Sequence, residues 1–357
     1  MKGRRITASL LALYAVVESS RLQDKRLYVA FVDVKKAFPS CNRALLFRKM
    51  SSVGASDRLV RALSALYEEA QGTVRGPGGF DRPFDIRIGT REGGVESPLL
   101  YILFVCDLIA RFDAALLADR GPLLDGREIR ALQLADDLAI MARSAADLEI
   151  LLRVWEAFCD EMHVETQIKK TEVVPFLGPD EEDSYIEGTT FFESVTRKGR
   201  RIIDDHWWTY KGARLRVVET FVYLGVLFDW REDGTAGWAD REGTAIKAFG
   251  ALMGTLFLVP FLPFERVIEV VSSIVGGGYL YGAEIWAPFI PRTGASPGSR
   301  ISKQVLTWLT GLHGARVARC RGWVMLRELD VEAESRAVRI LADAGVHGGL
   351  LARAVRL

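Results

Sequence analysis

Residues 134–138 read Leu-Ala-Asp-Asp-Leu and set two adjacent acidic residues, Asp136 and Asp137, between two apolar segments. Residues 128–134 alternate polar and apolar side chains, and residues 138–142 are all apolar. Both flanks predict β-strands joined by a tight turn. Like charges this close are costly unless a cation lies between them, so the pair indicates a divalent metal site. Taken alone, however, an Asp-Asp pair is more often a solvated turn.

A third carboxylate follows another predicted strand. Residues 27–32 form a continuous apolar run with β-branched and aromatic side chains, which is typical of a buried strand, and Asp33 comes directly after it. If both strands deliver their acids to one edge of a sheet, Asp33, Asp136 and Asp137 form an oxygen cluster suited to Mg²⁺. Such a cluster is typical of phosphoryl and nucleotidyl transfer, in which two metal ions stabilise the attacking and the leaving oxygen.

The composition indicates a folded protein of two or three subdomains, because 49% of the 357 residues are hydrophobic and 26% are charged. The formal net charge of +1 argues weakly against a nucleic-acid partner, since phosphate binding usually leaves a basic footprint. The four cysteines form no Cys-x-x-Cys pair, so neither a zinc knuckle nor a disulfide framework is indicated. We recognise no signal peptide or spanning segment and expect an intracellular protein, nuclear or cytoplasmic, with no membrane partner.

Five short motifs follow one another along the chain. They are Asp33-x-x-x-Ala37-Phe38, then Gly-Gly-Val-Glu-Ser-Pro-Leu-Leu at residues 93–100, then Ala135-Asp136-Asp137, Lys170-Thr171 and Tyr223-Leu224-Gly225. In this order and at these separations they resemble the successive palm motifs of a reverse transcriptase, an RNA-directed DNA polymerase, of the kind found in non-LTR retrotransposons. The resemblance covers residues 6–223.

The resemblance implies a role for each motif. Asp33 and Asp136 would bind both metal ions, two Mg²⁺ with Mn²⁺ as an alternative, while Asp137 would be the supporting third catalytic acid and the Val34 carbonyl a backbone ligand. Phe38 occupies the place of the steric gate that excludes a 2′-hydroxyl. Nucleotide binding is implied for Phe38, Glu92, Gly93 and Lys170, and a primer grip for Tyr223, Leu224 and Gly225.

The residues alone leave simpler explanations open for several of these positions. Phe38 is also explained by core packing, Lys170 by a solvated surface charge, and residues 221–228 by a plain core hairpin. The sequence also departs from the family pattern. Glu92 stands where glutamine is usual, and a carboxylate near phosphates is repulsive, so Glu92 faces away, pairs with Arg91 or lowers activity. Leu134 replaces an aromatic residue, and Gln167 replaces an asparagine.

Residues 45–67 and 147–162 show helical spacing of apolar side chains, and this alternation, with the two strand-borne acid sites, predicts an α+β fold with a ferredoxin-like palm. The resemblance implies a right-hand polymerase with partial fingers and a helical thumb beside that palm. Because almost nothing precedes the helix predicted at residues 7–23, where a complete family member carries a longer fingers region, we expect a chain that is N-terminally truncated relative to the family. The expected organisation is partial fingers at 1–26, palm with finger insertions and the metal-binding acids at 27–178, a loop and primer-grip-like strands at 179–236, thumb-like helices at 237–290, a linker at 291–300 and a C-terminal helical region at 301–357.

We therefore expect a reverse transcriptase core that adds deoxynucleotides to a primer 3′-hydroxyl, with an RNA template, a DNA primer and deoxynucleoside triphosphates as partners. The alternative is a catalytically silent palm, either a retroelement remnant or a nucleic-acid-binding scaffold, which the missing fingers, Glu92 and the near-neutral charge favour. An unrelated Mg²⁺-dependent nuclease would leave Phe38, the Gly-rich loop and Lys170 unexplained. The sequence leaves the oligomeric state open.

Overall fold

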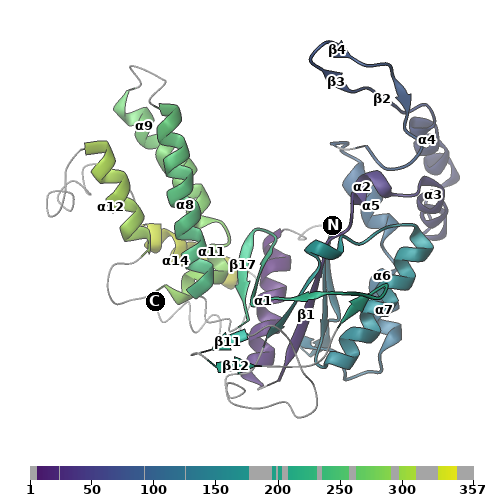
Figure 1. Ribbon diagram of the computed structural model, residues 1–357, viewed down its shortest axis with the longest axis horizontal. Coiled ribbons are helices and arrows are strands. Elements are labelled where there is room, and N and C mark those ends of the chain that lie inside the picture. The colour runs from purple at the N-terminus through teal and green to yellow at the C-terminus, as the bar shows by residue number, and fades with distance from the viewer. Residues whose placement is uncertain are drawn as a thin grey trace. The chain divides into compact units, whose positions relative to one another are not determined.

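The chain forms two compact units in the computed structural model (Figure 1). We call Lys25–Pro175 with Asp180–Val218 the sheet unit, and Met1–Asp24, Phe176–Pro179 and Glu219–Leu357 the helical unit. The boundaries between the units fall at residues 24/25, 175/176, 179/180 and 218/219, and the names fingers, palm and thumb stay predictions. The structure describes residues 6–23, 25–91, 93–124, 126–176, 195–197, 200–202, 208–230, 235–256, 263–290, 297–310 and 329–343.

A five-stranded sheet with the strand order β15-β10-β1-β9-β8 forms the centre of the sheet unit. Along the chain, β1, β8, β9 and β10 and the helices between them follow the βαββαβ order of a ferredoxin-like fold, so the predicted α+β class with a ferredoxin-like palm sheet is confirmed. The strand bounds are β1 Leu27–Val32, β8 Ala131–Leu134, β9 Asp137–Ala142, β10 Glu172–Phe176 and β15 Arg216–Val217.

The two central strands are buried because their sequences are apolar without interruption. Every residue of β1 is buried, and so is every residue of β9 after Asp137. Helix α7 (Ala145–Met162) packs against both strands and contributes Trp155 and Phe158 to the core. Its bounds are set locally, because the Ser144 hydroxyl accepts a hydrogen bond from the Asp147 N–H at 3.1 Å and His163 ends the helix in the left-handed conformation.

Between β1 and β8 the chain forms helices and small hairpins that flank the sheet. Helix α3 ends just before Gly54, whose φ is +89°, and α4 begins after the cap residue Ser56. The helices are α2 Ala37–Ser40, α3 Arg43–Ser52, α4 Asp57–Glu68, α5 Ser97–Phe104 and α6 Leu108–Ala115. The short strands are β2 Gln71–Gly72, β3 Arg75–Gly76, β4 Gly79–Phe80, β5 Phe84–Asp85, β6 Leu123–Leu124 and β7 Arg127–Glu128.

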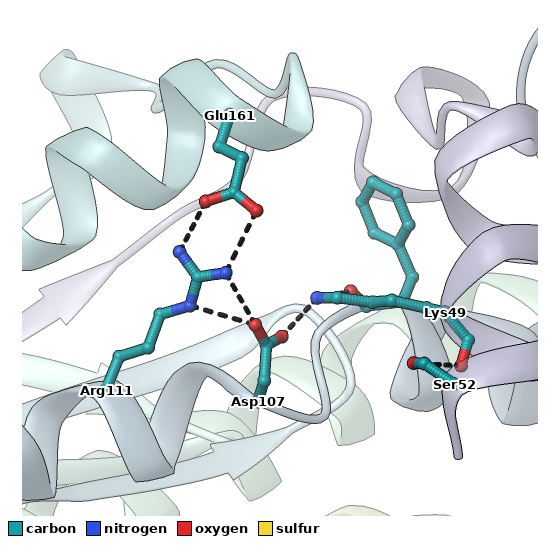
Figure 2. A network of polar contacts seen from close by, with 6 residues as sticks. Lys49, Ser52, Asp107, Arg111 and Glu161 are labelled. Carbon is teal, nitrogen blue, oxygen red and sulfur yellow. Dashed lines mark hydrogen bonds and ion pairs between the residues drawn. The ribbon is translucent and has the colours of Figure 1, made fainter. Parts of the chain in front are cut away.

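An ion-pair network ties three of these helices together (Figure 2). Asp107, directly before α6, accepts hydrogen bonds from Lys49 of α3 and from Arg111 of α6. The Arg111 guanidinium also donates to both carboxylate oxygens of Glu161 on α7, at 2.6 and 3.0 Å. The network therefore joins α3, α6 and α7 through one half-buried carboxylate.

Three short pieces flank β10 in the sheet unit. A single turn of 3₁₀-helix, Ile168–Lys170, precedes β10. Two small hairpins follow, and the second is held by the indole N–H of Trp208, which donates to the Ala145 carbonyl at 3.0 Å. Their strands are β11 Val195–Arg197, β12 Arg200–Ile202, β13 Thr209–Tyr210 and β14 Ala213–Arg214.

The helical unit combines one hairpin with helices around a second core. Ala245, Val275, Tyr279 and Trp286 are buried together in that core. Residues 297–300, expected in a linker, instead form the first turn of α12. Pro297 suits that position because proline lacks a backbone N–H, and an N–H in the first turn of a helix has no partner within the helix. The elements are α1 Ile6–Leu22, β16 Thr220–Tyr223, β17 Val226–Asp229, α8 Thr235–Leu256, α9 Phe264–Val271, a π-helical turn Ser272–Gly276, α10 Gly277–Leu280, α11 Ala283–Trp286, a 3₁₀ turn Ala287–Phe289, α12 Pro297–Thr310 and α14 Leu329–Asp343.

No helix in the described ranges combines the length and the apolar character that crossing a membrane requires.

Candidate active site

Two antiparallel strands bring the three predicted acids to one edge of the sheet. The register of β1 and β9 pairs Val32 with Leu138, so the next position along both strands sets Asp33 opposite Asp137. Asp136 lies in the turn that joins β8 to β9, where Leu134 pairs with Asp137. The expected hairpin is therefore present, and its turn reaches the end of β1.

The charges of these acids act on one another. Burial, followed by the negative charges of Asp136 and Asp33, raises the pKa of Asp137 above its ordinary value. The side chain of Asp33 is 44% exposed, and the Lys170 ammonium lies 3.9 Å from its Oδ2 atom. Among the described residues, no group of three Asp, Glu, His or Cys side chains lies where it could hold a metal ion as it stands. The acids nevertheless lie close enough for the charges of Asp33 and Asp136 to act on Asp137.

The backbone around Val34 leaves its carbonyl on the side of β9. The Asp33 main-chain carbonyl accepts a hydrogen bond from the Gln167 N–H at 2.8 Å, and the Lys35 N–H donates to the Glu165 carbonyl at 2.8 Å. Val34 sits between them in an isolated antiparallel bridge to Thr166. In a bridge of this kind the N–H and C=O of the middle residue point away from the partner strand. The Val34 carbonyl therefore points away from Thr166, and its role as a backbone ligand stays a prediction.

Phe38 lies in α2 and packs into the core of the sheet unit at the level of the acids. Its ring centroid is 5.1 Å from that of Tyr101 on α5. Burial, followed by the negative charge of Asp136, raises the pKa of Tyr101, which shows that Asp136 lies within electrostatic reach of this tyrosine. The contact between Phe38 and Tyr101 therefore joins the first motif to α5, whose first residues end the second motif. Phe38 is only partly buried, so both core packing and a gate function are compatible with its position.

The Gly-rich loop is bound directly to α2. The Gly89 N–H donates to the Cys41 carbonyl at 2.8 Å, and the Thr90 N–H donates to the Phe38 carbonyl at 2.9 Å. Gly89 has a φ of +85°, and a Cβ atom at this position would lie 2.5 Å from the Pro39 carbonyl oxygen. Only glycine permits this approach. Gly93 has a φ of +76° with open space around it, and Glu92 lies outside the described residues.

Tyr67 also holds this loop, a contact that was not predicted from the sequence. Its hydroxyl donates to the Glu96 carboxylate at 2.9 Å and accepts from the Arg91 N–H at 3.5 Å. The guanidinium carbons of Arg43 and Arg91 lie 4.9 and 5.6 Å from the centre of its ring. The helical spacing of apolar side chains in residues 45–67 predicted a helix with an apolar face, but it did not predict a tyrosine whose ring contacts two arginines.

Lys170 ends the 3₁₀ turn before β10. It is exposed, which agrees with a solvated surface charge, but its ammonium group also faces Asp33. The turn is fixed by Thr171, whose hydroxyl accepts from the Asp33 N–H at 3.3 Å and donates to the Gln167 carbonyl at 3.2 Å. The fourth motif is thus attached to the end of β1 by its threonine, and its lysine extends toward the acids.

The three predicted primer-grip residues form the turn of a hairpin in the helical unit. Tyr223 is buried and pairs with Val226, while Leu224 and Gly225 have φ values of 47° and 79°. Positive φ at both central residues is the requirement of a tight type I′ hairpin turn. The Tyr281 hydroxyl donates to the Leu224 carbonyl at 2.8 Å and holds this turn.

The family model described as "Reverse transcriptase (RNA-dependent DNA polymerase)" matches residues 2–228. The Pol polyprotein of the type-2 retrotransposable element R2DM of Drosophila melanogaster is 26% identical over 178 residues, which cover 50% of this chain and 16% of the relative. Those of the type-1 element R2 are 28% identical over 168 residues in Nasonia vitripennis (46% and 16% covered) and 24% identical over 225 residues in Popillia japonica (62% and 34% covered).

The chain therefore spans between 16% and 34% of the length of these curated relatives. Among solved structures, telomerase from Candida albicans in complex with a TWJ fragment of telomeric RNA has a TM-score of 0.43 at 10% identity, over 90% of this chain and 52% of that chain. Apo telomerase from Candida tropicalis has the same TM-score and identity, over 98% and 54%.

The match to the family model extends over more than half of the chain and includes all five motifs quoted above. The predicted likeness to non-LTR retrotransposons is confirmed by the R2 relatives. The chain belongs to the reverse transcriptase (RNA-dependent DNA polymerase) family.

Proposed function

We propose that the sheet unit carries the catalytic centre of an RNA-directed DNA polymerase, which adds deoxynucleotides to a primer 3′-hydroxyl opposite an RNA template. The observation that carries the proposal is the meeting of Asp33, Asp136 and Asp137 at one sheet edge, where the other two acids help to raise the pKa of Asp137. A cluster of carboxylates that repel one another is a site that gains stability from a divalent cation. Family membership supports the same reaction.

The donor set suits Mg²⁺, with Mn²⁺ as the alternative, because all of its atoms are oxygens. Asp33 and Asp136 would hold the ions, with Asp137 and the Val34 carbonyl as further ligands. Bound magnesium would supply charge stabilisation to the attacking and leaving oxygens. Because the three acidic side chains are not placed to hold a metal ion as they stand, they must rotate toward the ions on binding. Rotation is available to Asp33, whose carboxylate is half exposed.

The remaining predicted residues divide between the nucleotide and the primer. Phe38, packed on Tyr101 beside Asp136, would lie under the sugar and exclude a 2′-hydroxyl. Gly93, with open space around its Cα, would let a strand approach the backbone closely, and Glu92 would adjoin it. Lys170 would neutralise the departing pyrophosphate from its position beside Asp33.

Tyr223, Leu224 and Gly225 would support the primer end through their hairpin turn. The partners of the reaction are then an RNA template, a DNA primer and deoxynucleoside triphosphates. The curated relatives are Pol polyproteins of retrotransposable elements, which agrees with a copying reaction of this kind.

Primer extension on an RNA template tests the proposal. In Mg²⁺, the wild-type chain should extend an annealed DNA primer, and Asp136→Asn should lower the rate by about a hundredfold or more, a loss typical of removing one charge-stabilising group from an active site. Asp113→Asn is the matched control, because Asp113 is an exposed acid on α6 of the same unit and its substitution should leave the rate unchanged.

Equal rates for the wild type and Asp136→Asn would refute the assignment of this acid. A wild-type chain that binds the primed RNA but extends nothing would instead favour a silent palm scaffold.

A further inference from the structure

A β-ribbon at residues 70–88 projects from the sheet unit with its apolar side chains uncovered. It consists of the paired strands β2 and β5 and, beyond them, β3 and β4 (Figure 1). Phe80 is 74% exposed and Phe84 is 52% exposed, and Val74, Ile86 and Ile88 are exposed as well. Exposed apolar side chains gathered on one short element are uncommon on a surface that only faces water, so the ribbon is a candidate contact surface.

The base of the ribbon is fixed to the Gly-rich loop. One guanidinium, that of Arg43, donates to the carbonyls of Tyr67, Ile86 and Gly89 at 2.9, 2.7 and 2.8 Å. Gly89 in turn bonds to Cys41 beside α2, next to the candidate active site. The ribbon therefore extends from the part of the unit that holds the second motif, and its base cannot move without moving that loop.

The tip of the ribbon combines arginine with aromatic rings. Arg75 pairs with Phe80 across the ladder, and its guanidinium carbon lies 5.9 Å from the centre of the Phe80 ring. Phe84 lies across Gly72, since a Cβ added there would be 3.1 Å from the Phe84 ring. Arg82 lies between the two phenylalanines in the sequence and is exposed. Rings on which bases stack, next to guanidinium groups that contact phosphates, are the two components of single-strand recognition.

The charge distribution separates the tip from the base. Glu68, Glu69 and Asp85 line a pocket of about 830 Å³ at the base, together with Arg43 and Arg87. Asp85 lies 3.9 Å from Arg87 and accepts from Gln71 at 3.2 Å, so its charge is partly compensated. A phosphate backbone would be repelled by the acids at the base. The tip carries Arg75 and Arg82 against the single acid Asp81 and is the part that favours an anionic strand.

We propose that the tip of the ribbon, with Arg75, Phe80, Arg82 and Phe84, binds a single-stranded nucleic acid by base stacking and phosphate contacts. Within the reaction proposed above, on which this identification of the strand rests, the ligand is the RNA template ahead of the site of synthesis. Binding itself requires no catalysis and no metal.

The test measures the affinity of the full chain for a short unstructured RNA by fluorescence anisotropy. The ribbon variant Arg75→Ser with Phe80→Ser should bind at least about fivefold more weakly, the lower end of what losing one stacked base produces. Its plot of log K against log salt concentration should be shallower by about 0.7, the contribution of one phosphate contact to a single strand. The control is Arg58→Ser with Leu59→Ser, which removes an exposed arginine and an exposed apolar side chain from α4.

An unchanged affinity of the ribbon variant, or an equal loss in the control, would overturn the proposal. It would also be overturned if the ribbon variant changed the self-association of the chain in light scattering while RNA affinity stayed the same, because the ribbon would then contact a second copy. Single-stranded DNA and duplex RNA serve as further probes, and equal binding of the duplex would contradict stacking on unpaired bases.

Asp136→Asn separates the two proposals. This variant should bind RNA as tightly as the wild type. The effect of the ribbon substitutions on RNA affinity can therefore be measured even if primer extension fails. If the wild type extends the primer and the ribbon variant binds RNA as tightly as the wild type, only the proposal for the ribbon is rejected.

Discussion

Replacing Asp107 with asparagine removes the central charge of the network in Figure 2 while keeping its shape. Burial opposes ionisation of this carboxyl, but hydrogen bonds from Lys49 and Arg111 hold the pKa of Asp107 below its ordinary value. The Lys49 side chain is only 15% exposed and would be left beside a neutral amide. Arg111 would keep its paired bonds to Glu161.

The expected cost follows from these contacts. Two hydrogen bonds between charged groups become bonds to a neutral acceptor, which costs roughly 1 kcal/mol each, and partial exposure of Asp107 reduces the sum to about 1.5 kcal/mol. Glu161→Gln, at the exposed end of the same network, should cost only about 0.5 kcal/mol. For a unit of this size the Asp107→Asn loss corresponds to a fall in melting temperature of about 5 °C.

Thermal unfolding of both variants against the wild type, at neutral and at acid pH, is the assay. Because the pKa of Asp107 is lowered by folding, its contribution to stability is present above the unfolded-state pKa and is lost as pH falls through the folded-state value. The difference between wild type and Asp107→Asn should therefore shrink in acid. Equal destabilisation by Asp107→Asn and Glu161→Gln, or a difference independent of pH, would refute the reasoning.

Three further changes have definite outcomes. Arg130→Met should lower the free energy of unfolding by about 3 kcal/mol in a urea titration, because this buried guanidinium donates to four main-chain carbonyls at the end of α6; a change below about 1 kcal/mol would contradict that role. Gly89→Ala should destabilise the sheet unit and slow primer extension, because its Cβ would meet the Pro39 backbone at 2.5 Å, whereas Gly54→Ala, which meets no atom within 4 Å, tests the effect of positive φ alone. In metal-free buffer the stability of the wild type should fall as pH rises through the folded-state pKa of Asp137, because folding raises that pKa, and Asp137→Asn should lack this slope in melting experiments across pH.

The sequence predicted those features that depend on local pattern. Residue order alone predicted β1, the hairpin of β8 and β9, and the acids at the strand ends. A strand that is buried on both faces is apolar at every position, and such a run is recognisable in the sequence. The ferredoxin-like order followed from the alternation of predicted helices with the strands that carry the acids, and the sheet confirms it.

Contacts between distant segments were not predictable in this way. The contacts of the Tyr67 ring with Arg43 and Arg91 depend on how α3, α4 and the Gly-rich loop pack together. The spacing of residues within any one of these segments does not encode that packing. The exposure of Phe80 and Phe84 is likewise a property of the folded ribbon, because their sequence is as compatible with a buried strand as with an exposed one. The grouping of α1 with residues beyond 218 also depends on tertiary contacts alone.

Direct titration of the protein with Mn²⁺, followed by electron paramagnetic resonance, tests most sharply whether acids from two strands share one metal centre. Asp33→Asn and Asp136→Asn should each weaken Mn²⁺ binding by about tenfold or more, and the double variant should lose less than the sum of the two free-energy changes because both remove ligands of the same ions. Asp113→Asn should bind as the wild type does. Mn²⁺ affinity that Asp33→Asn leaves unchanged, or losses that are strictly additive, would contradict a shared centre.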